Sequence, residues 1–405
     1  MLDGFWIRNY RTLKQVGIGA CFPQFSYIDD WAAVLPYELG AATLFAGANG
    51  TGKSTVADAF SFVSDCFYHG VDFACQKRGG YSAVYTHGST GAMSFGFLYQ
   101  YEDESDPVTY AVSIACTAEK IPYIESELLA YRRGKESVPV FFLQNGIKTI
   151  RYLAPDERIT NAELTKIEFT DFKHLGLQAL ESHPKYPVLA AVRKLFNDWV
   201  PCDFTPDPAR GLDVSLPRKH ESQRGTNLSG LVKYLVNRYG SSLNGLLERI
   251  TNSLPDVNEI ILDVSQSERP RLSFKMYGQE TLIPITLMSA ADIRLFTYCL
   301  LLEEDEPAPL VFLEEPANGL DRLHKYAMFQ QIGRVMDFPK NRQMFATVHQ
   351  LDVIDAVHPS NVWLFEKDEN GHTSVERASD SMPSSEHGGE ALSPHWFSDR
   401  YNPHG

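Results

Sequence analysis

Alternating apolar and polar residues mark the start of the chain as strand-forming. Residues 2–20 follow this alternation, which predicts one or two strands. Two further strand-like runs, residues 93–99 and 108–114, flank an acidic segment, so the sequence predicts a hairpin there. Shorter strands are expected near residues 138–143 and 149–153.

Helical spacing dominates two later segments. Apolar residues recur every three or four positions in residues 174–200 and again in residues 228–254, which predicts helices. Between them, residues 202–226 are rich in proline, glycine and charge and are typical of an exposed connection. Strands are expected again at residues 259–264 and 272–277.

Three short apolar runs differ from these patterns, at residues 42–46, 310–313 and 344–348. Runs of this length without polar alternation are typical of strands that are buried on both faces. A glycine-rich loop follows the first run and polar or charged residues follow the other two, and α/β sheets bind ligands at the carboxyl ends of their strands. The sequence therefore predicts an α/β fold with functional groups at these strand ends.

The first buried run leads into a complete phosphate-binding loop of the form G-x-x-x-x-G-K-[ST]. Its glycines allow backbone N–H groups to turn toward phosphates, and the helix expected from Ser54 onward favours anions at its N-terminus. Lys53 is expected to contact the β- and γ-phosphates, and the Ser54 hydroxyl to bind Mg²⁺. The alternative, a glycine-rich turn before an ordinary helix, fits the flanking pattern less well. The predicted ATP-binding residues of this loop are Gly47, Asn49, Gly50, Thr51, Gly52, Lys53, Ser54 and Thr55.

Two carboxylates follow the second buried run. Neighbouring side chains on a strand point to opposite faces, so Glu314 and Glu315 are expected to have different tasks. Glu314 is predicted to hold Mg²⁺ through water, and Glu315 to act as the general base that polarises the attacking water. The alternative is a strand that ends in two solvated acids.

Two more residues are candidates for nucleotide binding. Ser289 precedes an apolar helical run, so its hydroxyl and the adjacent N–H groups are suited to bind a γ-phosphate; a purely structural helix cap is the alternative. His349 ends the third buried run and is a candidate sensor of the γ-phosphate. Taken alone, a histidine at such a position is more often an ordinary core or surface residue.

Composition narrows the class of protein. The chain has 405 residues, of which 43% are hydrophobic, so it can bury a substantial core. The net charge of -14 argues against a protein that coats nucleic acid, although a basic run at residues 218–224 leaves local DNA contact open. The six cysteines show no paired spacing, and no apolar stretch is long enough to cross a membrane. We therefore expect a cytoplasmic protein without membrane association.

These motifs, in this order, resemble the ABC-type ATPase heads of the RecF, SMC and OLD group, and most of all stand-alone bacterial ATPases of the AAA_21 type. The resemblance rests on the phosphate loop, the Ser289 segment, the carboxylates followed by Gly319-Leu320-Asp321, and the histidine at a strand end. Residues 5–13 are similar to that group's first strand and the turn after it, which adds Arg11 to the expected ATP-binding residues. The similarity spans about residues 2–370.

The resemblance implies a P-loop NTPase fold and a site shared by two copies. ATP and Mg²⁺ would lie between the phosphate loop of one head and the Ser289 segment of another, with Asp321 at the interface and His349 as the switch histidine. The family's signature glycine is matched by Ala291, and the usual first Walker B aspartate by Glu314. Because an alanine side chain limits how closely the backbone can approach a phosphate, we expect slow turnover.

The resemblance also implies a domain order. We expect a first ATPase lobe in residues 1–100, a family-type insertion in residues 101–225, a second lobe in residues 226–370 and a flexible tail in residues 371–405. The long interval between Ser54 and Ser289 argues against a transporter subunit, and the lack of sustained heptads argues against an SMC arm. We expect no OLD-type nuclease domain after His349.

The expected function is that of an ATPase head that forms a homodimer through its ATP sites and controls a separately encoded effector. We expect this effector to be a nuclease and the setting to be bacterial anti-phage defence; assembly beyond the dimer stays open. Two alternatives remain. One is a RecF-like repair ATPase that binds DNA directly, and the other is a regulatory scaffold that binds ATP and barely hydrolyses it.

Overall fold

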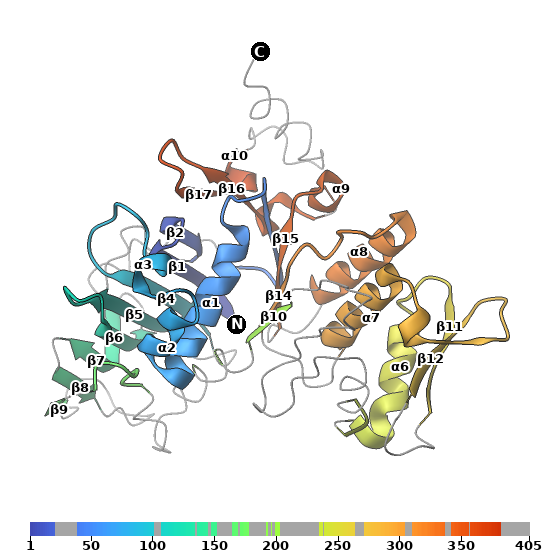
Figure 1. Ribbon diagram of the computed structural model, residues 1–405, viewed down its shortest axis with the longest axis horizontal. Coiled ribbons are helices and arrows are strands. Elements are labelled where there is room, and N and C mark those ends of the chain that lie inside the picture. The colour runs from blue at the N-terminus through green and yellow to red at the C-terminus, as the bar shows by residue number, and fades with distance from the viewer. Residues whose placement is uncertain are drawn as a thin grey trace, which may run out of the picture. The chain divides into compact units, whose positions relative to one another are not determined.

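The computed structural model divides the chain into two compact units, which are described here one at a time (Figure 1). The first unit consists of Met1–Gly40, Phe45–Asn197 and Pro359–Glu390, and the second of Ala41–Leu44, Asp198–His358 and Ala391–Gly405. The structure describes residues 1–20, 39–100, 107–133, 136–144, 147–151, 164–168, 171–177, 192, 196, 199–202, 235–237, 239–263, 271–303, 310–336, 342–355 and 357–381.

An eight-stranded antiparallel sheet forms much of the first unit, in the order β2-β1-β4-β5-β6-β7-β8-β9. The alternation in residues 2–20 is confirmed as two paired strands, and the predicted hairpin is confirmed as β4 and β5. The strands are β1 (Leu2–Tyr10), β2 (Leu13–Gly19), β4 (Met93–Tyr99), β5 (Val108–Cys116), β6 (Pro122–Arg133), β7 (Glu136–Gln144), β8 (Ile147–Arg151) and β9 (Leu164–Glu168).

Helix α1 (Lys53–His69) lies against this sheet (Figure 1) and buries aromatic side chains there. The Phe60 ring meets Phe5 of β1 and Phe97 of β4 edge-on, with ring centroids 5.0 Å apart in both cases. Such edge-to-face pairs add about 0.5–1.5 kcal/mol each to the burial of the rings. Two short helices follow, α2 (Val71–Gln76) and α3 (Tyr81–Val84). The packing fixes the helix whose first turn follows the phosphate loop.

A second sheet carries the three buried strands that the apolar runs predict. In the second unit its order is β10-β14-β15-β3, and the pairs β10/β14 and β14/β15 are parallel. Strand β3 continues into the first unit, where β16 and β17 follow as an antiparallel pair. The strands are β10 (Trp199–Cys202), β14 (Leu310–Leu313), β15 (Gln343–Val348), β3 (Ala42–Gly47), β16 (Val362–Lys367) and β17 (Thr373–Arg377).

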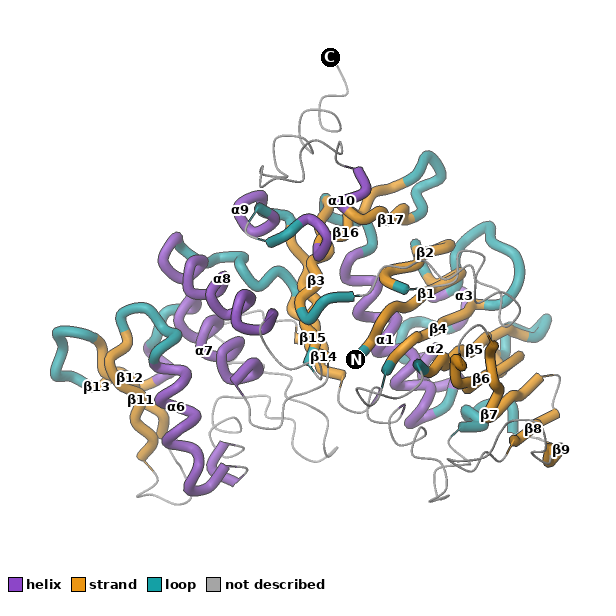
Figure 2. The backbone as a smooth tube through the Cα atoms, turned by 180° about the vertical axis from the view of Figure 1, so that it is seen from behind, coloured by secondary structure: helices purple, strands orange, loops and turns teal. Residues whose placement is uncertain are grey.

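The second unit also contains three helices that pack in sequence, with α6 against α7 and α7 against α8 (Figure 2). A small antiparallel sheet of order β11-β12-β13 packs beside them, and Phe274 of β12 meets Phe296 of α7 edge-on at 5.4 Å. The helices are α6 (Leu243–Thr251), α7 (Ala290–Glu303), α8 (Arg322–Met336), α9 (Leu351–Ile354) and, in the first unit, α10 (Ala378–Ser381). The strands are β11 (Val257–Asp263), β12 (Arg271–Met276) and β13 (Leu282–Pro284).

Several sequence predictions fall outside the described residues. These are most of the helix predicted in residues 174–200, nearly all of the connection at residues 202–226 with its basic run at 218–224, and the part of the predicted tail beyond residue 381. Some described residues of these segments differ from the prediction. Residues 199–200, predicted as helix, belong to strand β10, and residues 373–381, predicted as part of the tail, form β17 and α10. None of the helices that the structure describes is long and apolar enough to cross a membrane.

Candidate functional site

The phosphate loop connects β3 to α1 and is held by its own backbone. The Lys53 ammonium is buried and donates to the carbonyl oxygens of Gly47 and Ala48, each at 2.8 Å. Helix α1 starts directly at Lys53, and its N-cap residue Gly52 has no side chain to occupy the first N–H groups. The 17-residue helix thus presents an uncapped N-terminus beside a lysine, an arrangement that suits a polyphosphate.

Glycine is required at the end of this loop. Gly52 has φ 105°, and a Cβ added there would lie 2.3 Å from Thr373 Oγ1. Thr373 is the first residue of β17; its buried hydroxyl donates to the carbonyl of Thr51 at 2.8 Å and lies 3.0 Å from Thr12 Oγ1. Strand β17 therefore holds the loop from behind. Asn49, Gly50 and Ser54 are exposed, and Thr55 is half-buried.

Arg11 lies in a cluster of charged residues along α1. Its Nε forms an ion pair with Asp58 Oδ2 at 3.0 Å, and the Arg78 Nε donates to the other carboxylate oxygen at 2.7 Å. The Tyr10 hydroxyl donates to Asp58 at 2.5 Å; burial, and then the Asp58 charge, raise the pKa of Tyr10 well above its usual value. Arg11, in the turn between β1 and β2, is thus bound by Asp58 of α1, the helix that follows the phosphate loop.

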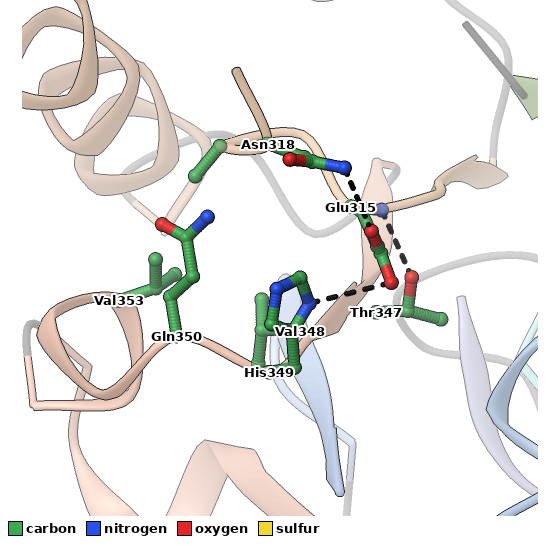
Figure 3. Close-up of a pocket in the computed structure, with 8 residues that line it drawn as sticks. Glu315, Asn318, Thr347, Val348, His349, Gln350 and Val353 are labelled. Atoms are coloured by element: carbon green, nitrogen blue, oxygen red, sulfur yellow. Dashed lines mark hydrogen bonds and ion pairs between the residues drawn. The ribbon is translucent and has the colours of Figure 1, made fainter. Parts of the chain in front are cut away.

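The candidate general base Glu315 follows β14 and is held from three sides. Its backbone is left-handed, with φ 43°, and its N–H donates to Thr347 Oγ1 at 2.9 Å. The carboxylate approaches His349 Nδ1 at 3.3 Å and accepts from Asn318 Nδ2 at 3.1 Å (Figure 3). The parallel pairing of β14 and β15 explains this meeting, because the carboxyl ends of both strands lie at the same edge of the sheet.

These residues line a pocket in the second unit, and Figure 3 shows Gln350 and Val353 around the same hollow as His349. Asn318 links the pocket to α7, because Arg294 Nη1 donates to the Asn318 carbonyl. The lining residues are Glu315, Ala317, Asn318, Thr347, Val348, His349, Gln350 and Val353.

Ser289 is the residue before α7 and forms a reciprocal cap with Asp292. The Asp292 N–H donates to Ser289 Oγ at 3.1 Å, and the serine hydroxyl donates to Asp292 Oδ2 at 2.6 Å. The other Asp292 oxygen lies 2.9 Å from His324 Nε2, and His324 Nδ1 lies 2.9 Å from Asp321 Oδ2. Asp321 also accepts from the N–H groups of His324 and Leu323, in the first turn of α8. One chain of polar contacts therefore joins the starts of α7 and α8.

The electrostatics of this chain favour a charged imidazole. Hydrogen bonding to Asp292, and then to Asp321, raises the pKa of His324 to about 9, against the opposing effect of burial. Burial alone would raise the pKa of Asp292, but its hydrogen bonds with His324 and Ser289 lower it overall. At neutral pH the group is therefore an imidazolium between two carboxylates.

The structure brings two pairs of predicted residues together. Glu315 and His349 are in direct contact, and Ser289 is linked to Asp321 through Asp292 and His324. The phosphate loop belongs to the first unit and these residues to the second, so the complete site is proposed rather than observed. Glu314 and Ala291 lie half-buried in the second unit.

Five residues that hold these side chains were not predicted from the sequence: Asp292, Asn318, His324, Thr347 and Thr373. Only Asn318, inside the turn after the carboxylates, carried a local signal. In the described parts of the chain no three His, Cys, Asp or Glu side chains are grouped to hold a metal ion. The exposed Ser54 hydroxyl, on the first turn of α1, is suited to one position on Mg²⁺ beside a bound polyphosphate.

Comparison with known proteins gives a family and a fold. The family model AAA_21, described as "AAA domain, putative AbiEii toxin, Type IV TA system", matches residues 42–355. An SMC head bound to the C-terminal winged-helix domain of ScpA is 13% identical, covers 94% of this chain and 99% of its own, and has a TM-score of 0.54. A Pyrococcus furiosus SMC head with an extended coiled coil, bound to the C-terminal domain of ScpA, is 12% identical with 94% and 97% coverage and a TM-score of 0.51. No curated protein matches the chain.

At these identities the solved structures establish the fold, while the family model spans well over half of the sequence. The protein therefore belongs to the AAA_21 family and has the fold of an ABC-type ATPase head of the SMC and RecF group.

Proposed function

We propose that the chain binds ATP with Mg²⁺ at its phosphate loop and hydrolyses it with Glu315 as the general base. The observation that carries this proposal is how Glu315 is held: a left-handed backbone, an N–H bound by Thr347, and a carboxylate bound by His349 and Asn318. A non-glycine residue in this conformation costs on the order of 1–3 kcal/mol, and such residues are enriched at functional sites. The surrounding contacts thus hold the carboxylate in one orientation at the end of β14.

The proposed reaction uses these groups in order. Lys53 would exchange the carbonyls of Gly47 and Ala48 for the β- and γ-phosphates. Glu315 would accept a proton from the water that attacks the γ-phosphorus, while His349 orients the carboxylate and senses the γ-phosphate. Mg²⁺, when bound, neutralises charge on the phosphates, and Ser54 and Glu314 are its proposed protein contacts.

We also propose that a second copy of the chain completes each ATP site, through Ser289 and Asp321. Both residues are exposed in the second unit. Three large apolar side chains close to them in the sequence are exposed as well: Leu287 by 74%, Tyr326 by 62% and Leu323 by 50%. Burial of these side chains against a second copy would add apolar contact to the shared site, and a twofold dimer would use the same surface on both copies.

A separately encoded effector is the proposed target of this ATPase. The SMC heads of similar fold were solved with ScpA domains bound, so this fold is compatible with a bound partner protein. The family description names a toxin–antitoxin system, and we propose a role in anti-phage defence in which the ATP-bound and ADP-bound dimers present different surfaces to a nuclease. A pull-down from the native host tests this with a Glu315→Gln bait and ATP, against a Lys53→Ala bait. Equal recovery of the same partners on both baits would contradict nucleotide gating.

The first experiment tests whether ATP promotes dimerisation. Sedimentation velocity of Glu315→Gln with saturating ATP and Mg²⁺ should show a dimer, because binding persists while hydrolysis is blocked. Lys53→Ala should stay monomeric under the same conditions, because it loses the phosphate contact. A Glu315→Gln protein that remains monomeric would argue against the shared site.

A further inference from the structure

Two Asp-x-x-His turns among the fully described residues share the same local geometry. In each, the aspartate accepts from the two backbone N–H groups at positions two and three further on, and its second oxygen contacts the histidine Nδ1. These turns are Asp171–His174 in the first unit and Asp321–His324 in the second; their His–Asp contacts measure 2.8 Å and 2.9 Å. Local structure alone therefore gives both histidines one carboxylate partner.

Tertiary packing separates the two turns. The His174 side chain is 47% exposed, whereas the His324 side chain is only 10% exposed and reaches a second carboxylate, Asp292, through Nε2. That second contact crosses from α8 to the first turn of α7. His324 thus ties together the starts of two helices that the cap residues Ser289 and Asp321 define.

The position of Asp292 raises an electrostatic problem for the proposed function. Ser289 is proposed to contact a γ-phosphate, yet its hydroxyl is bonded to the Asp292 carboxylate. The Asp292 carboxylate and a γ-phosphate bound at Ser289 would repel each other unless a cation lies between or beside them. His324 is the cation that contacts Asp292, and it offsets the charge of Asp321 as well.

We propose that His324 is a positioning residue for nucleotide recognition, which holds the Ser289–Asp292 cap of α7 against Asp321 and offsets the carboxylate charge where a second copy's ATP would lie. The inference rests on the proposed function, because it needs ATP to be shared between two copies. It adds to that function a residue that acts through Ser289 and Asp321.

A charge rescue tests the electrostatic part. In the Glu315→Gln background, His324→Gln should weaken ATP-dependent dimerisation by at least about tenfold, the equivalent of one pKa unit of charge interaction. Adding Asp292→Asn should restore most of that loss, because it removes the carboxylate that His324 offsets while an amide oxygen can still accept at the cap. His174→Gln is the matched control, since it breaks the same local turn without the second carboxylate, and it should leave dimerisation unchanged.

Three outcomes of this experiment would overturn the proposal. His324→Gln could behave like His174→Gln, the double variant could stay as weak as His324→Gln alone, or His324→Gln could melt at a much lower temperature than the double variant and so lose dimerisation through unfolding. If Glu315→Gln itself fails to dimerise with ATP, the proposed function fails first, and that result is distinguishable because it precedes any change at His324.

Mixing two inactive variants tests whether His324 acts across the dimer. His324→Gln and Lys53→Ala should each have little ATPase activity, but a mixed dimer contains one site with an intact Lys53 from one copy and an intact His324 from the other. Random pairing of a twofold dimer would leave about a quarter of the wild-type sites intact, and the weaker dimerisation of both variants lowers that share. Turnover should therefore rise above the sum of the two separate proteins but stay below a quarter of wild type. No recovery in a mixture in which cross-linking detects mixed dimers would place His324 in the same copy's site and overturn the proposal.

The pH profile is a readout that a merely structural role for the residue would not move in this way. The titratable groups that face His324 are Asp292 on α7 and Asp321 before α8, and together they raise its pKa to about 9. ATP-dependent dimerisation of the wild-type background should therefore weaken as pH rises through about 9, and His324→Gln should lack that limb. Parallel profiles for the two proteins would count against the proposal.

Discussion

The phosphate loop in the first unit and the carboxylate–histidine network in the second are held by different kinds of group. Lys53 is bonded to main-chain carbonyls of its own loop, and Thr373 holds the loop through the carbonyl of Thr51. In the second unit, side chains hold side chains: Glu315 with His349, and Asp292 with His324. The first arrangement depends on backbone shape and the second on charge. Substitutions and pH should therefore affect the two regions in different ways.

Removing the proposed base should have the largest effect. Glu315→Gln keeps the shape of the side chain and the contacts to Asn318 and Thr347, but an amide cannot take the proton of the attacking water. We expect turnover to fall by at least about 100-fold, in the range typical of general-base removal, while nucleotide binding persists. Phosphate release and binding of a fluorescent ATP analogue measure the two quantities separately.

The matched control for this variant is Glu280→Gln. Glu280 is an exposed acid of the same unit that pairs only with Lys275 among the contacts of the described residues, and its loss should leave turnover unchanged. Equal, negligible turnover in wild type and Glu315→Gln would show that Glu315 is no base here and would favour a scaffold that binds ATP without hydrolysing it.

In the phosphate-loop region, which main-chain contacts hold together, Gly52→Ala should lower the free energy of unfolding most. The residue has φ 105°, and an added Cβ would approach Thr373 Oγ1 to 2.3 Å, so Gly52→Ala combines backbone strain with a steric clash. We expect the free energy of unfolding to fall by about 2–3 kcal/mol, measured by urea unfolding of the full chain. Gly50→Ala is the control: it has φ 80° but open space for a Cβ, so backbone strain alone should cost about 1–2 kcal/mol. A smaller loss for Gly52→Ala than for Gly50→Ala would mean that Thr373 does not restrict the loop.

The phosphate loop and the carboxylate–histidine network differ in how fully the sequence predicts them. The phosphate loop is a contiguous motif whose chemistry needs a fixed order of residues, so nine positions were enough to predict it. Glu315 and His349 were predicted from apolar runs that end in polar residues, and the parallel pairing of β14 and β15 explains why they meet.

The rest depends on partners that no local pattern specifies. Thr373 supports a loop that lies 322 residues earlier, and the contact between His324 and Asp292 spans 32 residues and two helices. Hydrophobic periodicity shows that a segment is a strand or helix, but not which neighbour it packs against. The Asp321–His324 turn looked like an ordinary helix start in the sequence, and only the packing of α7 on α8 distinguishes it from Asp171–His174.

Substitution of Thr373 should have a smaller effect on the phosphate-loop region than Gly52→Ala. Thr373→Val keeps the shape of the side chain but removes the hydroxyl that donates to the Thr51 carbonyl, which leaves a buried acceptor without this donor. We expect the free energy of unfolding to fall by about 1–2 kcal/mol and the KM for ATP to rise, with kcat little changed. Thr373→Ser retains the hydroxyl and should remain close to wild type in KM. Loss of kcat at constant KM would indicate that β17 acts on chemistry and not on the shape of the loop.

The smallest expected effect is a difference in how pH changes the contribution of the two regions to the free energy of unfolding. The pKa of His324 is about 9 in the folded chain, above the ordinary histidine value of 6.5 that applies in the unfolded chain. The protonated form therefore stabilises the folded state. This stabilisation is fully present below about pH 6.5 and is lost as pH rises through about 9. After allowance for solvent screening, we expect wild type to exceed His324→Gln by about 1 kcal/mol at pH 6 and by almost nothing above pH 9. The difference between wild type and Thr373→Val should stay constant over the same range, because threonine does not titrate. Urea unfolding of the three proteins across this range measures both differences. A constant gap for His324→Gln would show that the second region is held by shape, as the first is, and not by charge.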